Sequence, residues 1–288
     1  MTQFTEADEM PGANQPITGM VGVEGGQLYY EVAGEGHPLV LIHAGISDSG
    51  MWDDQFGVFA QHHRVIRYDA RGFGKSRTES VSFSNRQDLY DLLKHVGAEK
   101  AYVLGISRGG QIAIDFTLEH PEMVDALIPV AAGLGGYEHK PADDEKSKHE
   151  MQMFAEMDEL WGKGEFARLA EMEVRMFVDG PGQSPDRVDP RVRERVQEMN
   201  ANNFSRQDGE TKPRPLEPPA IGRLAEIQAP TLIILGDLDT SGTLAMADFL
   251  ARGIAGARKV VIPGTAHMVN MERPGEFNRV VLDFLSER

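Results

Sequence analysis

A serine between two glycines is the first feature of this sequence that could do chemistry. The segment Gly105-Ile-Ser107-Arg-Gly109 fits the pattern G-x-S-x-G. An apolar segment, 101–106, precedes it, and a segment with helical periodicity, 110–120, follows it. A strand, a sharp turn and a helix in this order expose a serine hydroxyl for nucleophilic attack, and the turn has room only for small residues at the flanking positions. Ser107 is therefore a candidate nucleophile; the alternative is an ordinary glycine turn.

A serine hydroxyl is a poor nucleophile unless an imidazole accepts its proton and a third group orients that imidazole. The chain has nine histidines, and only His267 lies beyond His149. His267 follows a predicted strand at 259–262, in a loop from which its ring could reach the carboxyl ends of the other strands. We therefore expect His267 to be the base, although a lone loop histidine is more often merely solvated.

The acid should follow the strand between the nucleophile and the histidine. The apolar segment 231–235 leads into Gly-Asp237-Leu-Asp239, which supplies two candidates. Either aspartate could instead cap a helix that begins near Ser241, because aspartate is a common N-cap residue. The residues by themselves leave Asp237 and Asp239 in competition.

The elements that would position these groups alternate between strands and helices from about residue 20. Several strand candidates are continuous apolar runs, as expected of parallel strands buried on both faces. The pattern predicts an α/β fold with a doubly wound, mostly parallel sheet. The predicted strands are 27–32, 39–43, 65–69, 101–106, 126–131, 231–235 and 259–262. Helices are expected at 83–96 and 110–120.

The alternation stops between about residues 133 and 229, where helical periodicity continues without a convincing strand. Helical segments at 150–161, 166–177 and 192–199 predict an inserted helical unit. It closes with the proline-rich stretch KPRPLEPPA, which suits a stiff connector. The unit is rich in large apolar side chains that could line a pocket or, more commonly, fill its own core. These are Met151, Met153, Phe154, Met157, Trp161, Met172, Met176 and Phe177.

Composition excludes several other classes of protein. The formal net charge of −16 over 288 residues argues against binding to nucleic acid or to an anionic membrane surface. The absence of cysteine excludes a disulfide framework, a thiol nucleophile and a thiolate metal site. No apolar run is long enough to span a membrane, and residues 1–19 read as a mobile tail and not as a signal peptide. We expect a cytoplasmic protein without metal or cofactor.

Four segments together resemble the α/β-hydrolase superfamily: LIHAGISDSGMW, RYDARGFGKS, GISRGG, and GDLD with GTAHMVNMERPGEF. The resemblance extends over nearly the whole chain from about residue 20. It implies the chain order Ser107, Asp239, His267, because the last carboxylate of the family's G-x-x-D segment is the triad acid. It also implies a helical cap at 133–222, inserted into a core made of 20–132 and 223–288.

The resemblance further implies an oxyanion hole made by the backbone N–H groups of Gly45 and Arg108. The family usually has His-Gly before the first donor, and here Ala44 replaces that glycine. The segment Asp69-Ala-Arg71-Gly-Phe-Gly-Lys-Ser resembles a structural turn of the family, in which we expect Asp69 and Arg71 to pair. The Arg108 side chain could bind an acidic substrate or, more commonly, pack beneath the cap.

The expected activity is that of a serine hydrolase that cleaves a small to medium, largely apolar ester or lactone through an acyl-enzyme. Serine at the turn argues against the branches of the superfamily that use aspartate there, which resemble haloalkane dehalogenases and epoxide hydrolases. A C–C bond hydrolase or a cofactor-free perhydrolase would use the same residues. A non-catalytic small-molecule-binding protein of the same fold is the alternative from another class.

Overall fold

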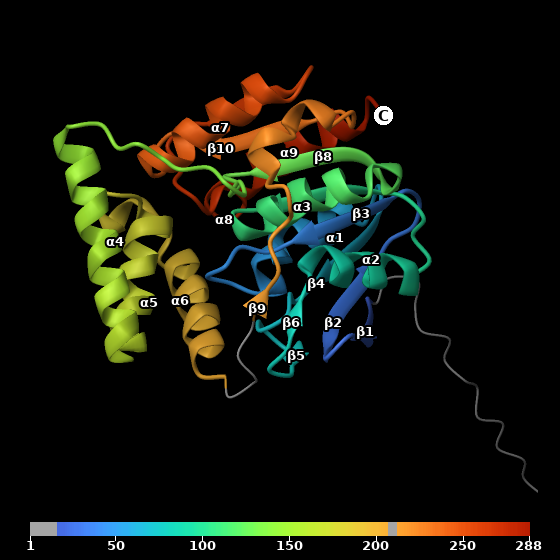
Figure 1. The fold of residues 1–288 in the computed structure, drawn as a ribbon, viewed down its shortest axis with the longest axis horizontal. Helices are drawn as coiled ribbons and strands as arrows, with labels where there is room; N and C mark the ends of the chain where they lie inside the picture. Colours follow the sequence, from blue (N-terminus) through green and yellow to red (C-terminus); the bar gives the residue numbers. More distant parts are fainter. Residues whose placement is uncertain (1–15, 207–211) are drawn as a thin grey trace, which may run out of the picture.

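The computed structural model describes residues 16–206 and 212–288, and within these residues nine strands form one sheet (Figure 1). The strand order is β1-β2-β4-β3-β7-β8-β10-β11, with β5 beside β2. The strands are β1 (Ile17–Val23), β2 (Gly26–Ala33), β3 (Pro38–Ile42), β4 (Arg64–Tyr68), β5 (Arg77–Thr78), β7 (Ala101–Ile106), β8 (Val124–Val130), β10 (Leu232–Gly236) and β11 (Arg258–Ile262). The α/β class predicted from the sequence is confirmed.

The sheet is parallel from β4 to β11, and antiparallel where β2 pairs with β1, β4 and β5. The inner strands β7 and β10 are buried along their whole length. Parallel strands of this kind need helices on both faces, and their polar carboxyl ends gather at one edge. The loops after β3, β7, β10 and β11 therefore lie at the same edge of the sheet.

Helices cover both faces of the sheet and enclose two hydrophobic clusters. Side chains of α2, α3 and α7 pack against one face, and side chains of α1, α8 and α9 pack against the other. The apolar residues of each helix recur at helical spacing, so each helix buries one stripe against the sheet. The helices are α1 (Asp53–Phe59), α2 (Asn85–His95), α3 (Arg108–Glu119), α7 (Ser241–Gly253), α8 (Val269–Glu272) and α9 (Pro274–Leu285).

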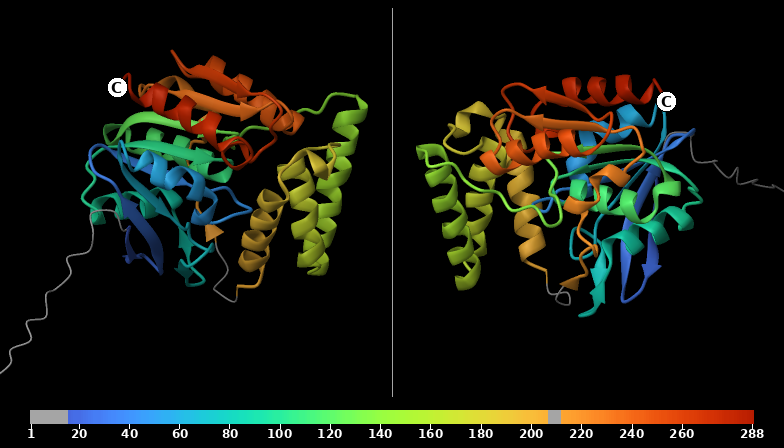
Figure 2. Two further views of the ribbon diagram at one scale, coloured as in Figure 1. Left: turned by 180° about the vertical axis from the view of Figure 1, so that it is seen from behind. Right: turned by 45° about the horizontal axis from the view of Figure 1, so that its top comes forward.

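The helical insertion consists of α4 (Glu145–Lys163), α5 (Phe166–Val174), a π-helical turn (Arg175–Asp179) and α6 (Pro190–Phe204). These helices stand together beside the sheet in all three ribbon views (Figures 1 and 2). Asp144 caps α4 by accepting a hydrogen bond from the Ser147 N–H, and Gly164 ends it in a left-handed conformation. The insertion has a small core of its own, made of Met153, Met157, Leu160, Leu169 and Met176.

Two predictions about the strands need correction. Strand β1 begins at Ile17, inside the segment predicted as a tail, because it is held by antiparallel pairing with β2, a tertiary contact that the local sequence does not show. Residues 1–15 of that segment lie outside the described residues. A two-residue strand, β9 (Lys212–Pro213), also pairs with β6 (Ser82–Phe83) where no strand was expected. It lies in the proline-rich connector, which joins the insertion back to the core.

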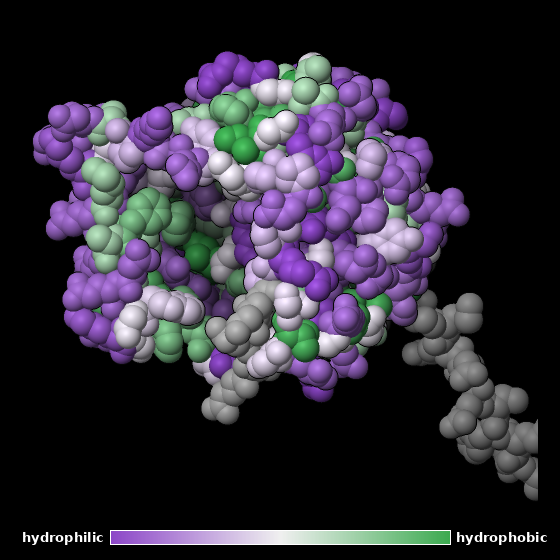
Figure 3. Space-filling view, in the orientation of Figure 1, coloured by the Kyte–Doolittle hydropathy of each residue, from purple (hydrophilic) through white to green (hydrophobic). Residues whose placement is uncertain are grey.

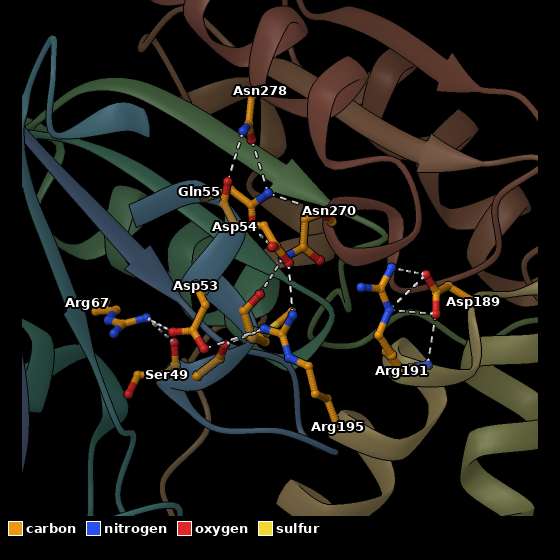
Figure 4. A network of polar contacts seen from close by, with 12 residues as sticks. Ser49, Asp53, Asp54, Gln55, Arg67, Asp189, Arg191, Arg195, Asn270 and Asn278 are labelled. Carbon is orange, nitrogen blue, oxygen red and sulfur yellow. Dashed lines mark hydrogen bonds and ion pairs between the residues drawn. The ribbon is translucent and has the colours of Figure 1, made fainter. Parts of the chain in front are cut away.

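A buried polar network ties the first helix of the core to the last two (Figure 4). The Gln55 amide donates to the Asn278 side chain at 3.0 Å, and the Asn270 amide donates to the Gln55 oxygen at 3.0 Å. At the edge of this network, Arg195 of α6 bonds Asp54 of α1 at 3.0 Å. The insertion is thereby attached to the beginning of α1. None of the helices in 16–206 and 212–288 has the length and apolar character needed to cross a membrane.

Candidate active site

Ser107 occupies a strained turn between β7 and α3. Its φ of 57° and ψ of −117° lie in a region that side-chain-bearing residues rarely adopt, at a cost on the order of 1–3 kcal/mol. The turn is fixed by its own backbone: the Ser107 N–H donates to the Val130 oxygen at 2.9 Å, and the Ser107 oxygen accepts from Gln111 and Gly133, each at 3.0 Å. The Arg108 N–H is the first of α3, where helical N–H groups have no partner within the helix.

The two flanking glycines are required by close contacts between backbone segments. A Cβ atom at Gly105 would lie 2.1 Å from the Gly109 oxygen, and one at Gly109 would lie 2.2 Å from the Ile42 oxygen. Both distances are far below van der Waals contact, so larger side chains cannot occupy these positions without moving the backbone. The G-x-S-x-G pattern therefore reflects how tightly β7, α3 and β3 meet at this turn.

His267 and Asp239 form a buried pair at the same edge of the sheet. Nδ1 of His267 lies 2.7 Å from Oδ2 of Asp239, and the two residues are 5% and 0% exposed. The other oxygen of Asp239 accepts from the Thr240 N–H at 2.7 Å. Because this pair occupies Nδ1, the second ring nitrogen of His267 is left as the one that can exchange a proton in the cavity.

Asp237, the competing acid candidate, points elsewhere. It is exposed, and its carboxylate accepts from the Gly264 N–H at 2.7 Å. It therefore braces the loop after β10 against the loop that carries His267. The structure brings Asp239, and not Asp237, to the imidazole.

Ser107 and His267 line one cavity of about 420 Å³ between the core and the insertion. The surface is hollowed there, and hydrophobic residues gather on the side of the insertion (Figure 3). Most of the lining surface is apolar, and the apolar side chains in it are Ala131, Ala132, Pro141, Met151, Phe154, Phe177 and Met246. Of the apolar residues noted in the insertion, Met151, Phe154 and Phe177 line the cavity, whereas Met153, Met157 and Met176 fill the core of the insertion.

The loop after β3 brings Gly45 beside the nucleophile turn. A Cβ atom at Gly45 would lie 3.8 Å from the Arg108 side chain, so the two segments are in contact. The preceding N–H, that of Ala44, points to the sulfur of Met51 at 3.2 Å. Burial lowers the pKa of His43 to about 4, and this neutral ring accepts from the Ala70 N–H at 2.9 Å. His43 therefore serves to join two loops.

The Arg108 side chain turns away from the cavity. Its guanidinium carbon lies 4.7 Å from the centre of the Phe73 ring, and Nη2 donates to Asn85 at 3.1 Å. Arg108 does not contribute its side chain to the lining of the cavity, so the packing alternative describes it better than binding of an acidic substrate. Burial lowers the pKa of this guanidinium.

The expected pairing of Asp69 with Arg71 is wrong. Arg71 forms a two-pronged pair with Asp88 of α2, at 2.7 and 3.0 Å. Asp69 instead accepts from the backbone N–H groups of Ser49 and Lys75, at 2.8 and 2.7 Å. Two adjacent loops each present a backbone N–H group that needs an acceptor here, and the Asp69 carboxylate accepts one hydrogen bond from each loop.

One polar part of the cavity was not found from the sequence. Glu150, Ser241 and His139 line it, and Nε2 of His139 lies 3.4 Å from the Ser241 hydroxyl. Glu150 sits within an amphipathic helix that carries many acidic residues, so nothing in the local pattern distinguishes it. In residues 16–206 and 212–288, no group of three or more His, Asp or Glu side chains is arranged to hold a metal ion.

The family model of the alpha/beta hydrolase fold matches residues 37–274. The chain is 28% identical over 273 residues to a 2-hydroxy-6-oxo-6-phenylhexa-2,4-dienoate hydrolase of Comamonas testosteroni, and the match covers 91% of this chain and 92% of that relative. The enol-lactonase from Burkholderia xenovorans LB400 shares the fold with a TM-score of 0.71 and 22% identity, over 93% of this chain and 100% of its own. A structure titled as an N-acyl homoserine lactone degrading enzyme matches at 25% identity and a TM-score of 0.72, over 92% of this chain and 100% of its own. The chain therefore belongs to the α/β-hydrolase fold family and is a hydrolase.

Proposed function

We propose that this hydrolase cleaves carboxylic esters or lactones with a triad of Ser107, His267 and Asp239. One observation carries the proposal: a serine in a strained, glycine-flanked turn shares a cavity with a histidine whose Nδ1 is 2.7 Å from a buried aspartate. A nucleophile, a base and an orienting acid in this arrangement are what acyl transfer through a serine requires.

The reaction divides into two halves. Oγ of Ser107 attacks the substrate carbonyl while the free nitrogen of His267 takes the hydroxyl proton, and Asp239 holds and stabilises the imidazolium. The N–H groups of Gly45 and Arg108 bind the oxyanion, which collapses to an acyl-enzyme as His267 returns the proton to the leaving alcohol. Water, deprotonated by His267, then attacks the acyl-enzyme and releases the acid. With a lactone, the alcohol and the acid remain parts of one product.

The cavity suggests the size and polarity of the substrate. A volume of about 420 Å³ suits a small to medium molecule, and the largely apolar lining favours an apolar acyl or alcohol group. We propose that residues 133–222 act as a cap over this cavity, and that 20–132 and 223–288 form the core that carries the triad. Met151, Phe154 and Phe177 would then be the side chains through which the cap shapes the pocket.

A second candidate activity is hydrolysis of a carbon–carbon bond. It is favoured by the similarity to the dienoate hydrolase, which covers both chains almost completely. The same triad would serve, because it needs only an electrophilic carbonyl and a leaving group that can accept a proton.

The test is to assay a short-chain p-nitrophenyl ester, a lactone and 2-hydroxy-6-oxo-6-phenylhexa-2,4-dienoate with the wild type and with Ser107→Ala. Ester or lactone turnover should fall on the order of 10⁴-fold in the variant, because no other residue supplies the nucleophile. Turnover of the dienoate alone would favour the second candidate. Turnover that survives in Ser107→Ala would contradict both.

A further inference from the structure

The cavity contains a buried carboxylate, that of Glu150. Among the described residues that line it there is no lysine or arginine, and its ionisable groups are His139, Glu150 and His267. Glu150 is only 4% exposed. A charged side chain is almost never buried to this extent unless other groups bind it. Hydrogen-bond donors must therefore hold this carboxylate in place, and its charge disfavours a second anion in the cavity.

Glu150 is held by the beginning of α7. The Ser241 N–H lies 3.0 and 3.1 Å from its two carboxylate oxygens, and the Ser241 hydroxyl donates to one of them. The positive end of a helix attracts an anion, and here Ser241, Gly242 and Thr243 of α7 line the cavity. Glu150 already occupies the position that an anionic substrate group would seek. A second N–H of this terminus also has a partner, because the Thr243 N–H donates to the Thr240 hydroxyl at 3.1 Å.

The nearest cation is committed to the same groups. Nζ of Lys146 lies 3.7 Å from Glu150 and donates to the backbone oxygen of Asp239 at 3.2 Å. Lys146 is about half exposed and does not belong to the residues that line the cavity. Both sources of positive potential at this end, the α7 terminus and Lys146, therefore face Glu150 and not the substrate.

We propose that Glu150 is a specificity-determining residue that selects substrates with an uncharged acyl group and rejects those whose acyl group carries a carboxylate. A substrate carboxylate in this apolar cavity would meet a like charge and no free cation, which is an unfavourable arrangement in a low-dielectric site. The proposal rests on the proposed ester or lactone hydrolysis and deepens it.

The experiment compares two esters of the same length, p-nitrophenyl butyrate and mono-p-nitrophenyl succinate, which differ in a terminal methyl against a carboxylate. The measured quantity is the ratio of their kcat/KM values. We expect the wild type to favour the butyrate by at least about tenfold, and Glu150→Gln to reduce this ratio by about tenfold, because the amide keeps the shape but not the charge.

Glu173→Gln is the matched control. Glu173 is a largely buried carboxylate of the same insertion, bonded by Asn200 at 2.5 Å and absent from the lining of the cavity. The same substitution there should leave the ratio unchanged. Lys146→Met leaves the Glu150 carboxylate in place and removes the positive charge beside it. This loss should raise the preference for the butyrate.

The possible results distinguish a failure of the proposed role of Glu150 from a failure of the proposed ester hydrolysis. Similar kcat/KM values for the two esters in the wild type would overturn the role of Glu150 and leave ester hydrolysis standing. An unchanged ratio in a folded Glu150→Gln would do the same, as would an unchanged ratio in Lys146→Met if Glu150→Gln failed to fold. No hydrolysis of either ester, with Ser107 also unlabelled by a fluorophosphonate, would overturn the proposed function and the selectivity together.

Discussion

The nucleophile turn and the helical insertion meet at one cavity but are held by different forces. In the turn, backbone touches backbone: Gly105 lies against Gly109, and Gly109 against Ile42, with no room for a Cβ atom. The insertion is attached by side chains: Arg195 bonds Asp54, Asn203 bonds the Ser47 oxygen at 3.0 Å, and Glu150 bonds Ser241.

This difference explains what each region can tolerate. Where backbone packs against backbone, only one conformation of the turn fits. Few residue types are therefore possible at the flanking positions, and the position of Ser107 is fixed. An insertion held by polar side chains and a small core of methionine and leucine can be rebuilt with other residues of similar volume. The chemistry should therefore depend on the core, and the choice of substrate on the insertion.

The largest expected effect is on kcat. It should differ sharply between two aspartates of one loop, Asp239 and Asp237. Asp239→Asn should lower kcat on the order of 10³–10⁴-fold, because the amide no longer holds the imidazole in the required tautomer and charge state. Asp237→Asn, two residues earlier, loses only its bond to the Gly264 N–H and should change kcat less than about threefold. Steady-state kinetics on one ester measures both. Equal losses in the two variants would show that the acid is wrongly assigned.

The next largest effect is on stability. The same substitution, glycine to alanine, is made once in the turn and once in the insertion. Gly105→Ala should cost about 3 kcal/mol or more of unfolding free energy, since the new methyl would lie 2.1 Å from the Gly109 oxygen. Gly162→Ala, in helix α4, meets nothing within 4 Å and should add about 0.5–1 kcal/mol by restricting the unfolded chain. Urea unfolding measures both. Two changes of the same sign would contradict the contrast drawn between turn and insertion.

A smaller effect concerns Asp115 of α3, whose carboxyl is buried in the core. Burial raises its pKa to about 6 from 3.8, although Arg86 acts in the opposite direction. The folded state therefore binds this proton more tightly than the unfolded state, and stability falls as the pH rises from about 4 to about 6. Asp115→Asn should raise the unfolding free energy at pH 7 by on the order of 1–3 kcal/mol and leave it unchanged below pH 4.

Thermal unfolding at several pH values would follow this gain. The control is Asp237→Asn, the same substitution at an exposed position. A loss of stability in Asp115→Asn at pH 7 would mean that the ionised carboxylate is favoured by its surroundings and that the direction of the shift is wrong.

The core could be predicted from the sequence because its signals are local and strong. The apolar run at 101–106 predicts a strand. Gly105 near its end, together with Ser107 and Gly109, predicts a turn that only small flanking residues allow. Strand β1 was missed because its residues are mostly exposed and its pairing with β2 is a tertiary contact. Two glycines, Gly19 and Gly22, also interrupt its short apolar sequence, and glycine within a strand weakens the strand signal.

The polar contacts of the site could be predicted only in part. The chain order of serine, acid and histidine predicted a triad; the structure places Asp239 on His267, and Ser107 and His267 on one cavity. The family pattern, and not the local residues, separated Asp239 from Asp237. The partner of Arg71 proved to be Asp88, seventeen residues away on α2, and spacing along the chain carries no information about such a contact. Glu150 likewise reaches Ser241 across 91 residues, so its place in the cavity follows from packing alone.

The central claim is that His267 activates Ser107, and covalent labelling tests it most directly. The protein would be treated with a fluorophosphonate, and the site and rate of phosphonylation would be determined by intact mass and peptide mapping. We predict a single adduct on Ser107, none in Ser107→Ala, and labelling slower on the order of 10²–10⁴-fold in His267→Gln. No adduct in the wild type, or labelling of His267→Gln at the wild-type rate, would contradict the account.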